Sequence, residues 1–365
     1  MKDSREADRH WMQRAVELAQ QGVGLTRPNP PVGAVLVKSG RIIGEGWHRK
    51  AGTTHAEARS IQTAGSLARG ATLYVTLEPC STFGKTPPCT DSILQSGIRR
   101  VVVGCLDPNP VHHGRGVRLL RAAGLEVSVG VLRKDTLRLV EPFSKWVNTG
   151  RPWVTLKMAL SIDGRLADAS GTSRWITGRE ARRAVHDLRR TADAIMVGRR
   201  TVLRDDPCLL PRPARGRKPL RVVLDSHGSL PLRLRVFTDG YSAQTVVFTS
   251  CRTRRCWVER VRVSGANVVR VHRVSGGLDL EEVLLRLGEM GVMHLLCEGG
   301  GQLAGSLVRM RLVDRLVLYL GPRLLGEEGL PGFVLGRTVL ASAPRLLTES
   351  ASRVGDSMLI TAHLR

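Results

Sequence analysis

The sequence is poor in aromatic residues and has no long apolar run. Phe, Trp and Tyr make up 4% of its 365 residues, too few for an evident platform on which nucleic-acid bases could stack. No segment approaches the roughly 20 consecutive apolar residues that cross a bilayer. The charged N-terminal segment also lacks the apolar core of a secretory signal. We therefore expect a cytoplasmic protein without a membrane span.

Cysteine and lysine are both scarce. The seven cysteines stand at positions 80, 89, 105, 208, 251, 256 and 297, an odd number that fits no disulfide framework. Only eight of the 56 basic residues are lysine, and the arginines are scattered through both halves. The net charge of +24 is compatible with polyanion binding. Without a basic tail or interleaved aromatics, it favours a generally basic surface suited to phosphorylated small molecules over a nucleic-acid site.

The length predicts two domains, because single cores stop growing near roughly 250 residues. Gly150 and Pro152 punctuate the best boundary, which gives domains 1–148 and 149–365. In the first domain the apolar periodicity predicts helices over 8–21, 55–64, 91–95, 116–123 and 137–147. These alternate with strands over 32–37, 41–47, 71–77, 99–106 and 126–132. This alternation indicates a three-layer α/β fold with helices on both faces of one sheet.

The second domain has a similar alternation. Strands are expected over 153–160, 194–198, 220–226, 245–250, 268–271, 293–299 and 314–320, with helices over 179–190, 279–290 and 304–308. The two halves show no internal repeat. The second domain is therefore predicted to be another α/β unit with its own core.

Four residues of the first domain form a pattern typical of a zinc-dependent hydrolytic deaminase. His55 opens a predicted helix, Cys80 follows a strand, and Cys89 is reached through an eight-residue loop. One imidazole and two thiolates leave the fourth tetrahedral position open for water, as a catalytic zinc requires. Glu57, two residues beyond His55, can serve as the proton shuttle to the departing ammonia.

Two plainer interpretations compete with this one. His55 could cap a helix and Glu57 could be a solvated charge on it, while the cysteines are thiols of the core. Alternatively, a closed structural zinc site would need a fourth ligand, for which Cys105 is the nearby candidate. The combination of all four residues with Pro79 and Pro88 favours the catalytic site.

Several motifs closely resemble those of the bacterial bifunctional riboflavin-biosynthesis deaminase-reductases. They are PNP (28–30), GEGWH (44–48), HAE (55–57), EPCSTFGKTPPC (78–89) and DPNP (107–110). The resemblance implies one zinc ion and deamination of 2,5-diamino-6-ribosylamino-4(3H)-pyrimidinone 5′-phosphate, with Asn29, His48 and Lys85 near the substrate. Two departures stand out: Thr82 replaces a usual histidine, and His112 and His113 replace a usual apolar-Ala-Gly stretch. These histidines could compensate near the phosphate or form an exposed loop pair.

The second domain also resembles the reductase half of that family. A glycine-rich turn at 297–302 precedes a helix and can admit a phosphate, although alone it is more often a tight turn. Further similar motifs are TLKMALSIDGRLA (155–167), SRWITG (173–178), the stretch 187–212 and LDS (224–226). The resemblance implies a dihydrofolate-reductase-like fold that uses NADPH. The residues it places along the dinucleotide are Ala159, Trp175, Thr201, Asp205, Ser226, Gly300, Gly301, Gln302, Leu303, Ala304, Gly305 and Ser306.

The same resemblance assigns a substrate group in the second domain. Its members are Lys157, Ser173, Arg189, Leu209, Arg212 and Glu298. Arg189 and Arg212 can clamp a ribose phosphate, and Glu298 can accept hydrogen bonds from ring amines. The expected activity is deamination followed by NADPH reduction of the ribosyl group to ribityl. A nucleic-acid base deaminase with an accessory domain and a zinc-stabilised binding protein are the alternatives. The sequence is compatible with a homo-oligomer.

Overall fold

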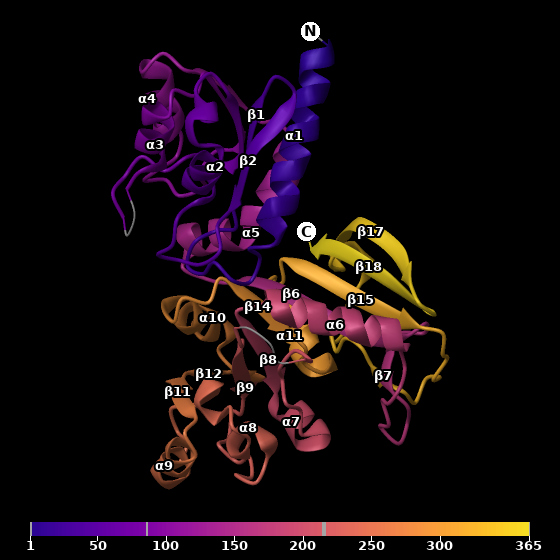
Figure 1. The fold of residues 1–365 in the computed structure, drawn as a ribbon. Helices are drawn as coiled ribbons and strands as arrows, with labels where there is room; N and C mark the ends of the chain where they lie inside the picture. Colours follow the sequence, from indigo (N-terminus) through magenta and orange to yellow (C-terminus); the bar gives the residue numbers. More distant parts are fainter. Residues whose placement is uncertain (1, 85–86, 214–216, 365) are drawn as a thin grey trace. The chain divides into compact units, whose positions relative to one another are not determined.

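The structure is a computed structural model that describes residues 2–84, 87–213 and 217–364. It divides into two compact units, which meet in the sequence between Gly150 and Arg151. Figure 1 labels the elements of both units. Within the described ranges, no helix is long and apolar enough to cross a membrane.

The first unit is built on a five-stranded sheet. In sheet order its strands are β2 (Arg41–Trp47), β1 (Gly33–Lys38), β3 (Thr72–Leu77), β4 (Arg100–Cys105) and β5 (Glu126–Val129). β1 is antiparallel to β2 and β3, whereas β3, β4 and β5 are parallel. The parallel strands bring the ends of β3 and β4 to the same edge. β5 ends at Val129, earlier than predicted, because Gly130 and Leu132 adopt positive φ values.

Helices cover both faces of this sheet, as the alternation predicts. On one face lie α2 (Ala56–Ala64), α3 (Cys89–Gln95) and α4 (Arg115–Ala122), with the short turn η1 (Gly65–Ala68). On the other lie α1 (Lys2–Gln20) and α5 (Arg133–Thr149). Alternate strand residues serve the two layers. Leu36 and Val75 belong to the core beneath α2, and Val35 and Tyr74 to the core beneath α1.

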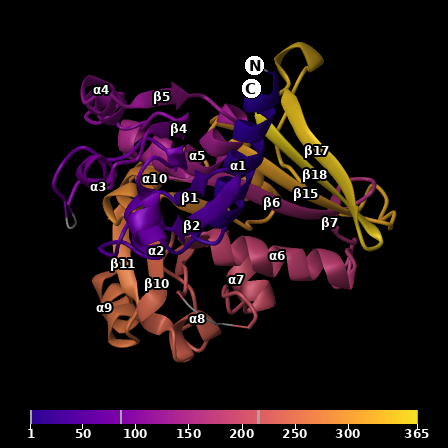
Figure 2. The same cartoon turned by 45° about the horizontal axis from the view of Figure 1, so that its top comes forward.

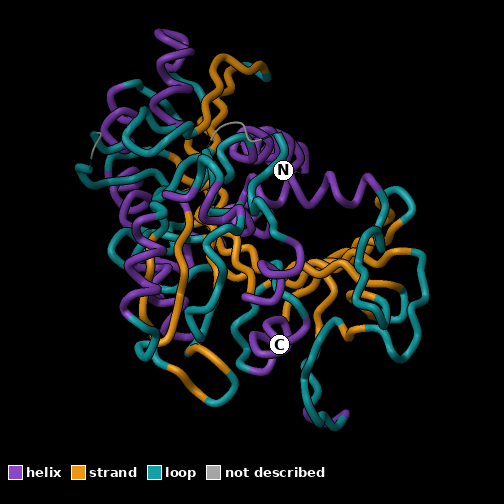
Figure 3. Tube along the Cα trace, turned by 90° about the horizontal axis from the view of Figure 1, so that it is seen from below, coloured by secondary structure: helices purple, strands orange, loops and turns teal. Residues whose placement is uncertain are grey.

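The second unit is built on a nine-stranded sheet. Its order is β11 (Asn267–Val271), β10 (Thr245–Ser250), β9 (Leu220–Leu224), β8 (Ala194–Gly198), β14 (His294–Cys297), β6 (Trp153–Ser161), β15 (Arg315–Gly321), β18 (Ser357–Leu364) and β17 (Leu346–Val354). The strands from β11 to β15 are parallel, and β18 and β17 continue the sheet antiparallel. Figure 3 draws the strands of both units in orange.

Helices flank this sheet on both faces as well. α10 (Leu280–Glu289) and α11 (Gly301–Arg309) pack on one face of β6. α6 (Arg179–Thr191) lies across the other face, over β6 and β15 (Figure 1). α7 (Arg199–Asp205), α8 (Arg235–Thr238) and α9 (Arg255–Val263) extend that second layer. The remaining short elements are β7 (Arg165–Ala167), β12 (Arg273–Val274), β13 (Gly277–Leu278), β16 (Leu330–Pro331), η2 (Ser242–Gln244) and η3 (Leu340–Ser342).

Some elements of the second unit carry no clear sequence pattern. The hairpin of β17 and β18, beside β15 in Figure 2, was not predicted. Strand β17 is exposed at most positions, so it lacks the alternation that marks a half-buried strand. The helix predicted over 304–308 begins earlier, at Gly301. Its extra first turn contains glycine, which sequence propensity disfavours in a helix.

Candidate active sites

His55, Cys80 and Cys89 converge beyond the end of β3. His55 immediately precedes α2, and Cys89 is the first residue of α3. The Nδ1 atom of His55 lies 3.3 Å from Cys89 Sγ and 3.6 Å from Cys80 Sγ. All three candidate ligand atoms lie within 4.8 Å of one another, and among the described residues they form the one such group of three His, Cys, Asp or Glu side chains. The donor set suits a zinc ion with one open position.

Cys105 does not join this group. Its buried thiol donates a hydrogen bond to the Thr76 carbonyl at 3.4 Å, and burial raises the pKa of the Cys105 thiol to about 12. The closed four-ligand site considered from the sequence is therefore not formed by the described residues.

Glu57 lies in the first turn of α2, beside the cluster, and is only 4% exposed. Burial, followed by the nearby Cys80 thiolate, raises the pKa of Glu57 to about 7. A carboxyl group that titrates near neutrality can both accept and release a proton at working pH. Hydrogen bonding by Cys89 and His55 lowers the pKa of Cys80 to about 4, which favours the thiolate that binds a metal.

Asn29 and His48 lie next to the metal-ligand cluster. The amide Nδ2 of Asn29 is 3.1 Å from Nε2 of His48, and the His48 ring packs edge-on against His55 with 5.0 Å between ring centroids. Burial and the neighbouring His55 lower the pKa of His48 to about 4, so its ring is neutral. A hydrogen bond with the backbone of Thr54 opposes part of this shift.

Glu78, a buried residue between β3 and Cys80, has a structural role that the sequence motifs did not indicate. Its carboxylate accepts hydrogen bonds from the backbone N–H groups of Asp107 at 3.0 Å, Gly114 at 2.8 Å and Val117 at 3.1 Å. These contacts fix the loop after β4 and the start of α4 against the metal-ligand cluster. The sequence feature that could have indicated this role is an ionisable residue directly after a buried strand, because a buried charge requires partners.

The departures from the family pattern occupy the loops around this cluster. Thr82 is half-buried in the loop between the two cysteines, and Lys85 lies outside the described residues. His113 is exposed, with its Nδ1 2.9 Å from the carbonyl oxygen of Asp107. The neighbouring His112 is half-buried, and its Nδ1 has no partner among the described residues.

Three of the residues expected at the dinucleotide, Ser226, Thr201 and Gly300, lie along one edge of the sheet of the second unit. Because β9, β8, β14 and β6 are parallel, their carboxyl ends share this edge, which is where open α/β sheets bind ligands. Ser226 follows β9 and Thr201 follows β8. A Cβ added to Gly300, which follows β14, would meet only Thr201 Oγ1 at 3.9 Å.

The start of α11 is shaped for a close approach of another group. No side chain caps its first turn at Gly300, so its N–H groups and helix dipole are available to an anion. Gly301 and Gly305 fit tightly against a later loop, because an added Cβ would lie 2.3 Å from Pro331 O and 2.1 Å from Val334 O respectively. The glycines of this segment thus serve two purposes, open space at Gly300 and tight packing below it.

Three of the residues expected at the substrate form one charged cluster. Arg189 pairs with Glu298 through two hydrogen bonds, Nε to Oε1 at 2.7 Å and Nη2 to Oε2 at 2.9 Å. Arg189 also donates to the Leu210 carbonyl at 3.1 Å. Burial opposes ionisation of Glu298, but Arg189 outweighs it and keeps the pKa of Glu298 below its usual value. Burial lowers the pKa of the nearby Lys157.

Other expected residues occupy different surroundings. Ala159 packs on the face of β6 that α6 covers. Trp175 is 60% exposed, with the Arg182 guanidinium 4.2 Å from its ring centroid. Asp205 ends α7, and Ser173 is half-buried in the loop before α6. The Leu209 side chain is 2% exposed in the core, so only its backbone can face a substrate.

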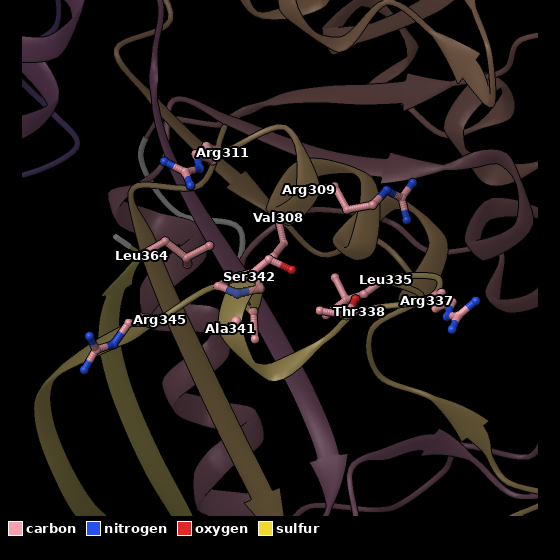
Figure 4. Close-up of a pocket in the computed structure, with 12 residues that line it drawn as sticks. Val308, Arg309, Arg311, Leu335, Arg337, Thr338, Ala341, Ser342, Arg345 and Leu364 are labelled. Carbon is pink, nitrogen blue, oxygen red and sulfur yellow. The ribbon is translucent and has the colours of Figure 1, made fainter.

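A separate cavity of about 550 Å³ lies at the far end of α11 (Figure 4). None of the residues expected at either site lines it. Its arginines include Arg309, Arg311, Arg337 and Arg345, but their guanidinium groups point away from its middle rather than toward one another. This geometry does not form an anion clamp.

Comparison with known proteins matches both units. Residues 5–105 match the cytidine and deoxycytidylate deaminase zinc-binding region, and residues 152–360 match the RibD C-terminal domain. The riboflavin biosynthesis protein RibD of Aquifex aeolicus is 42% identical over 98% of both chains. The Escherichia coli protein of that name is 40% identical over 97% of this chain and 98% of its own.

Solved structures give the same result. The diaminohydroxyphosphoribosylaminopyrimidine deaminase/5-amino-6-(5-phosphoribosylamino)uracil reductase of Thermotoga maritima is 37% identical with a TM-score of 0.88, covering 99% of this chain and 100% of that one. RibD of Acinetobacter baumannii is 35% identical with a TM-score of 0.89 over 99% of both chains.

Fold and sites together define a two-domain enzyme, with a zinc-dependent cytidine-deaminase-like domain followed by a dihydrofolate-reductase-like domain. The chain belongs to the RibD family of bifunctional deaminase-reductases of riboflavin biosynthesis. This confirms the fold class and the bifunctional activity expected from the sequence. The nucleic-acid deaminase and the binding protein considered as alternatives are set aside.

Proposed function

We propose that the first domain removes the 2-amino group of 2,5-diamino-6-ribosylamino-4(3H)-pyrimidinone 5′-phosphate. The second domain then uses NADPH to reduce the ribosyl group of 5-amino-6-(5-phosphoribosylamino)uracil to ribityl. The observation that carries the proposal is the convergence of His55, Cys80 and Cys89 beside the buried Glu57. The Thermotoga maritima relative bears the names of both reactions.

In the deaminase site, His55, Cys80 and Cys89 would hold one zinc ion, which supplies the Lewis acidity that makes water nucleophilic near neutral pH. Glu57 takes the proton from the attacking water and passes it to the amino group, which leaves as ammonia. Its buried position in the first turn of α2, beside the cluster, suits both transfers. Asn29 and His48 bind the pyrimidine beside the cluster, and the family resemblance adds Lys85.

In the reductase site, NADPH supplies the hydride. The open backbone at Gly300 and the uncapped start of α11 support binding of its phosphates there. The other contacts with the dinucleotide are proposed for the residues expected from the sequence, which include Ala159, Trp175 and Ser306. Exposure of Trp175 leaves its ring accessible to this cofactor.

Arg189 and Glu298, held by their ion pair, would orient the substrate. The other residues proposed around the substrate are Lys157, Ser173, Arg212 and the backbone of Leu209. As hydride reaches C1′, the C1′–O4′ bond breaks with its electrons going to O4′, which takes up a proton. We assign that proton to the buried Lys157, whose charge interacts with Glu298 and Arg189.

Ammonia release from the diaminopyrimidine ribotide, measured on zinc-loaded protein without and then with NADPH, tests both steps. We expect ammonia without NADPH and NADPH oxidation once it is added. Zinc bound without ammonia release would overturn the deaminase assignment. Ammonia release without subsequent NADPH oxidation would overturn the reductase assignment.

A further inference from the structure

The end of α6 holds the chain near Arg212 through three side chains. The N–H of Arg212 donates a hydrogen bond to Nδ1 of His186 at 3.2 Å. Arg190 donates to the carbonyl of Arg212 at 2.7 Å, and Arg189 to the carbonyl of Leu210 at 3.1 Å. His186 and Arg189 are three residues apart on one helix and therefore share a face. This face bears the Arg189 pair with Glu298.

The contact with Arg212 determines where the His186 ring carries its proton. A backbone N–H can only donate, so Nδ1 must accept, and the proton of the neutral ring is on Nε2. Protonation of Nδ1 would set two N–H groups against each other. Burial, followed by the charges of Arg189 and Arg212, also keeps the ring neutral, because these groups lower the pKa of His186. Arg190 acts in the same direction, and only Glu298 opposes it.

The Nε2–H group of His186 is thus a hydrogen-bond donor without a partner in the described part of the chain. The side chain is half-buried, and its Nε2 atom is not fully enclosed, so a ligand can reach it. The charges of Arg189 and Arg212 are both close enough to act on this ring. A neutral N–H beside two guanidinium groups can contact an anion without adding a third positive charge.

We propose that His186 binds the substrate phosphate in the reductase site by donating a hydrogen bond from Nε2, beside the guanidinium groups of Arg189 and Arg212. Its Nδ1 meanwhile anchors the backbone of Arg212, so one ring both builds the phosphate site and contacts the phosphate. This inference rests on the proposed reductase function and adds a residue that the sequence motifs did not single out.

Two substitutions separate the roles of the two ring nitrogens. In His186→Asn the side-chain oxygen occupies the place of Nδ1 and keeps the anchor to Arg212, but nothing reaches the place of Nε2. In His186→Gln the amide reaches the place of Nε2 and loses the anchor. KM and kcat of each variant are measured with 5-amino-6-(5-phosphoribosylamino)uracil and with the riboside that lacks phosphate, and inorganic phosphate is tested as a competitor.

We expect His186→Asn to raise KM for the phosphorylated substrate about tenfold or more, the effect of losing a hydrogen bond to a charged group. The inhibition constant of phosphate should rise in parallel, whereas KM for the riboside, NADPH binding and the melting temperature should stay near those of the unaltered protein. His186→Gln should raise KM less and lower the melting temperature more. His272→Asn is the control, because the His272 side chain is 78% exposed and pairs with Glu282 on the surface.

Unchanged KM and phosphate inhibition in His186→Asn would overturn the proposal. Equal KM increases for phosphate-bearing and phosphate-free substrates would also overturn it, since they indicate a purely structural residue. Failure of the unaltered protein to oxidise NADPH with the phosphorylated substrate would instead contradict the proposed reductase function itself.

Discussion

The carboxylate of Glu78 accepts a hydrogen bond from the backbone N–H of Gly114 at 2.8 Å, across 36 residues of sequence. With two further backbone donors on the same carboxylate, this links the residue before Pro79 to the start of α4. In Glu78→Gln one oxygen becomes an N–H₂ group that cannot accept. Leaving such a buried donor unmatched costs about 1–3 kcal/mol.

We expect Glu78→Gln to lower both the melting temperature of the deaminase domain and the rate of ammonia release, with zinc content retained. Calorimetry, metal analysis and the ammonia assay measure the three quantities. Glu126→Gln is the matched control, because Glu126 is 61% exposed in its pair with Arg100 and such pairs contribute at most about 1 kcal/mol. Equal melting temperatures and equal rates of ammonia release in the two variants would contradict this role of the Glu78 hydrogen bonds.

Glu57→Gln should retain zinc but reduce ammonia release by at least about 100-fold, the usual contribution of a positioned acid-base group. NADPH oxidation with pre-deaminated substrate should continue at the unaltered rate. Loss of both activities together would show that the two sites are not independent.

Removal of zinc by a chelator should abolish ammonia release and lower the melting temperature of the deaminase domain, because a ligand that binds only the folded state stabilises it. NADPH oxidation with pre-deaminated substrate should persist, and added zinc should restore ammonia release. Ammonia release that survives complete metal removal would exclude the proposed role of His55, Cys80 and Cys89.

Arg189→Met should lower the free energy of unfolding of the reductase domain by about 3–5 kcal/mol, because it leaves the Glu298 carboxylate buried and unpaired. Both side chains of this pair are largely buried, at 16% and 10% exposed. Arg262→Met, at a 56% exposed arginine paired with Glu259, should change stability little. Denaturant unfolding followed by tryptophan fluorescence compares the two, and similar losses would refute the ion-pair argument.

The same pair predicts a direction of pH dependence. The pKa of Glu298 is lower in the folded protein than its usual value, so its ionisation stabilises the fold above the unfolded pKa, near 4.3. This stabilisation is lost as pH falls through the folded pKa. Acid unfolding should therefore show a steeper loss of stability below about pH 4.5 in the unaltered protein than in Glu298→Gln. Parallel pH curves would contradict it.

Gly305→Ala should destabilise the reductase domain, because the added Cβ would lie 2.1 Å from Val334 O. Overpacking of this kind costs about 1–3 kcal/mol, and NADPH should bind more weakly as α11 shifts. Gly240→Ala is the control, since nothing lies within 4 Å of a Cβ there. Thermal melts and NADPH fluorescence titration measure both effects, and an unchanged Gly305→Ala protein would show that the loop yields freely.

The sequence predicted most of the first domain because its strands alternate or run apolar and its helices carry clear apolar faces. The sequence could predict that His55, Cys80 and Cys89 lie together with Glu57 beside them, because metal chemistry demands particular residue types at elements that meet in space. The role of Glu78 could not, because backbone donors far along the chain create it. Leu209 was expected at the substrate, but its side chain lies in the core, and sequence similarity alone does not tell backbone from side-chain contacts. The exposed edge strand β17 leaves little pattern to read.

The closeness of two thiols at the deaminase site makes this site sensitive to oxidants when zinc is absent. The sulfur atoms of Cys80 and Cys89 lie within 4.8 Å of each other. Without zinc, an oxidant could therefore join them in a disulfide bond after a small movement. A zinc ion that ties up both thiolates would also shield them from oxidants. Zinc binding and protection of these two thiols from oxidation would then be linked, and the deamination step would be the one affected by a shortage of zinc.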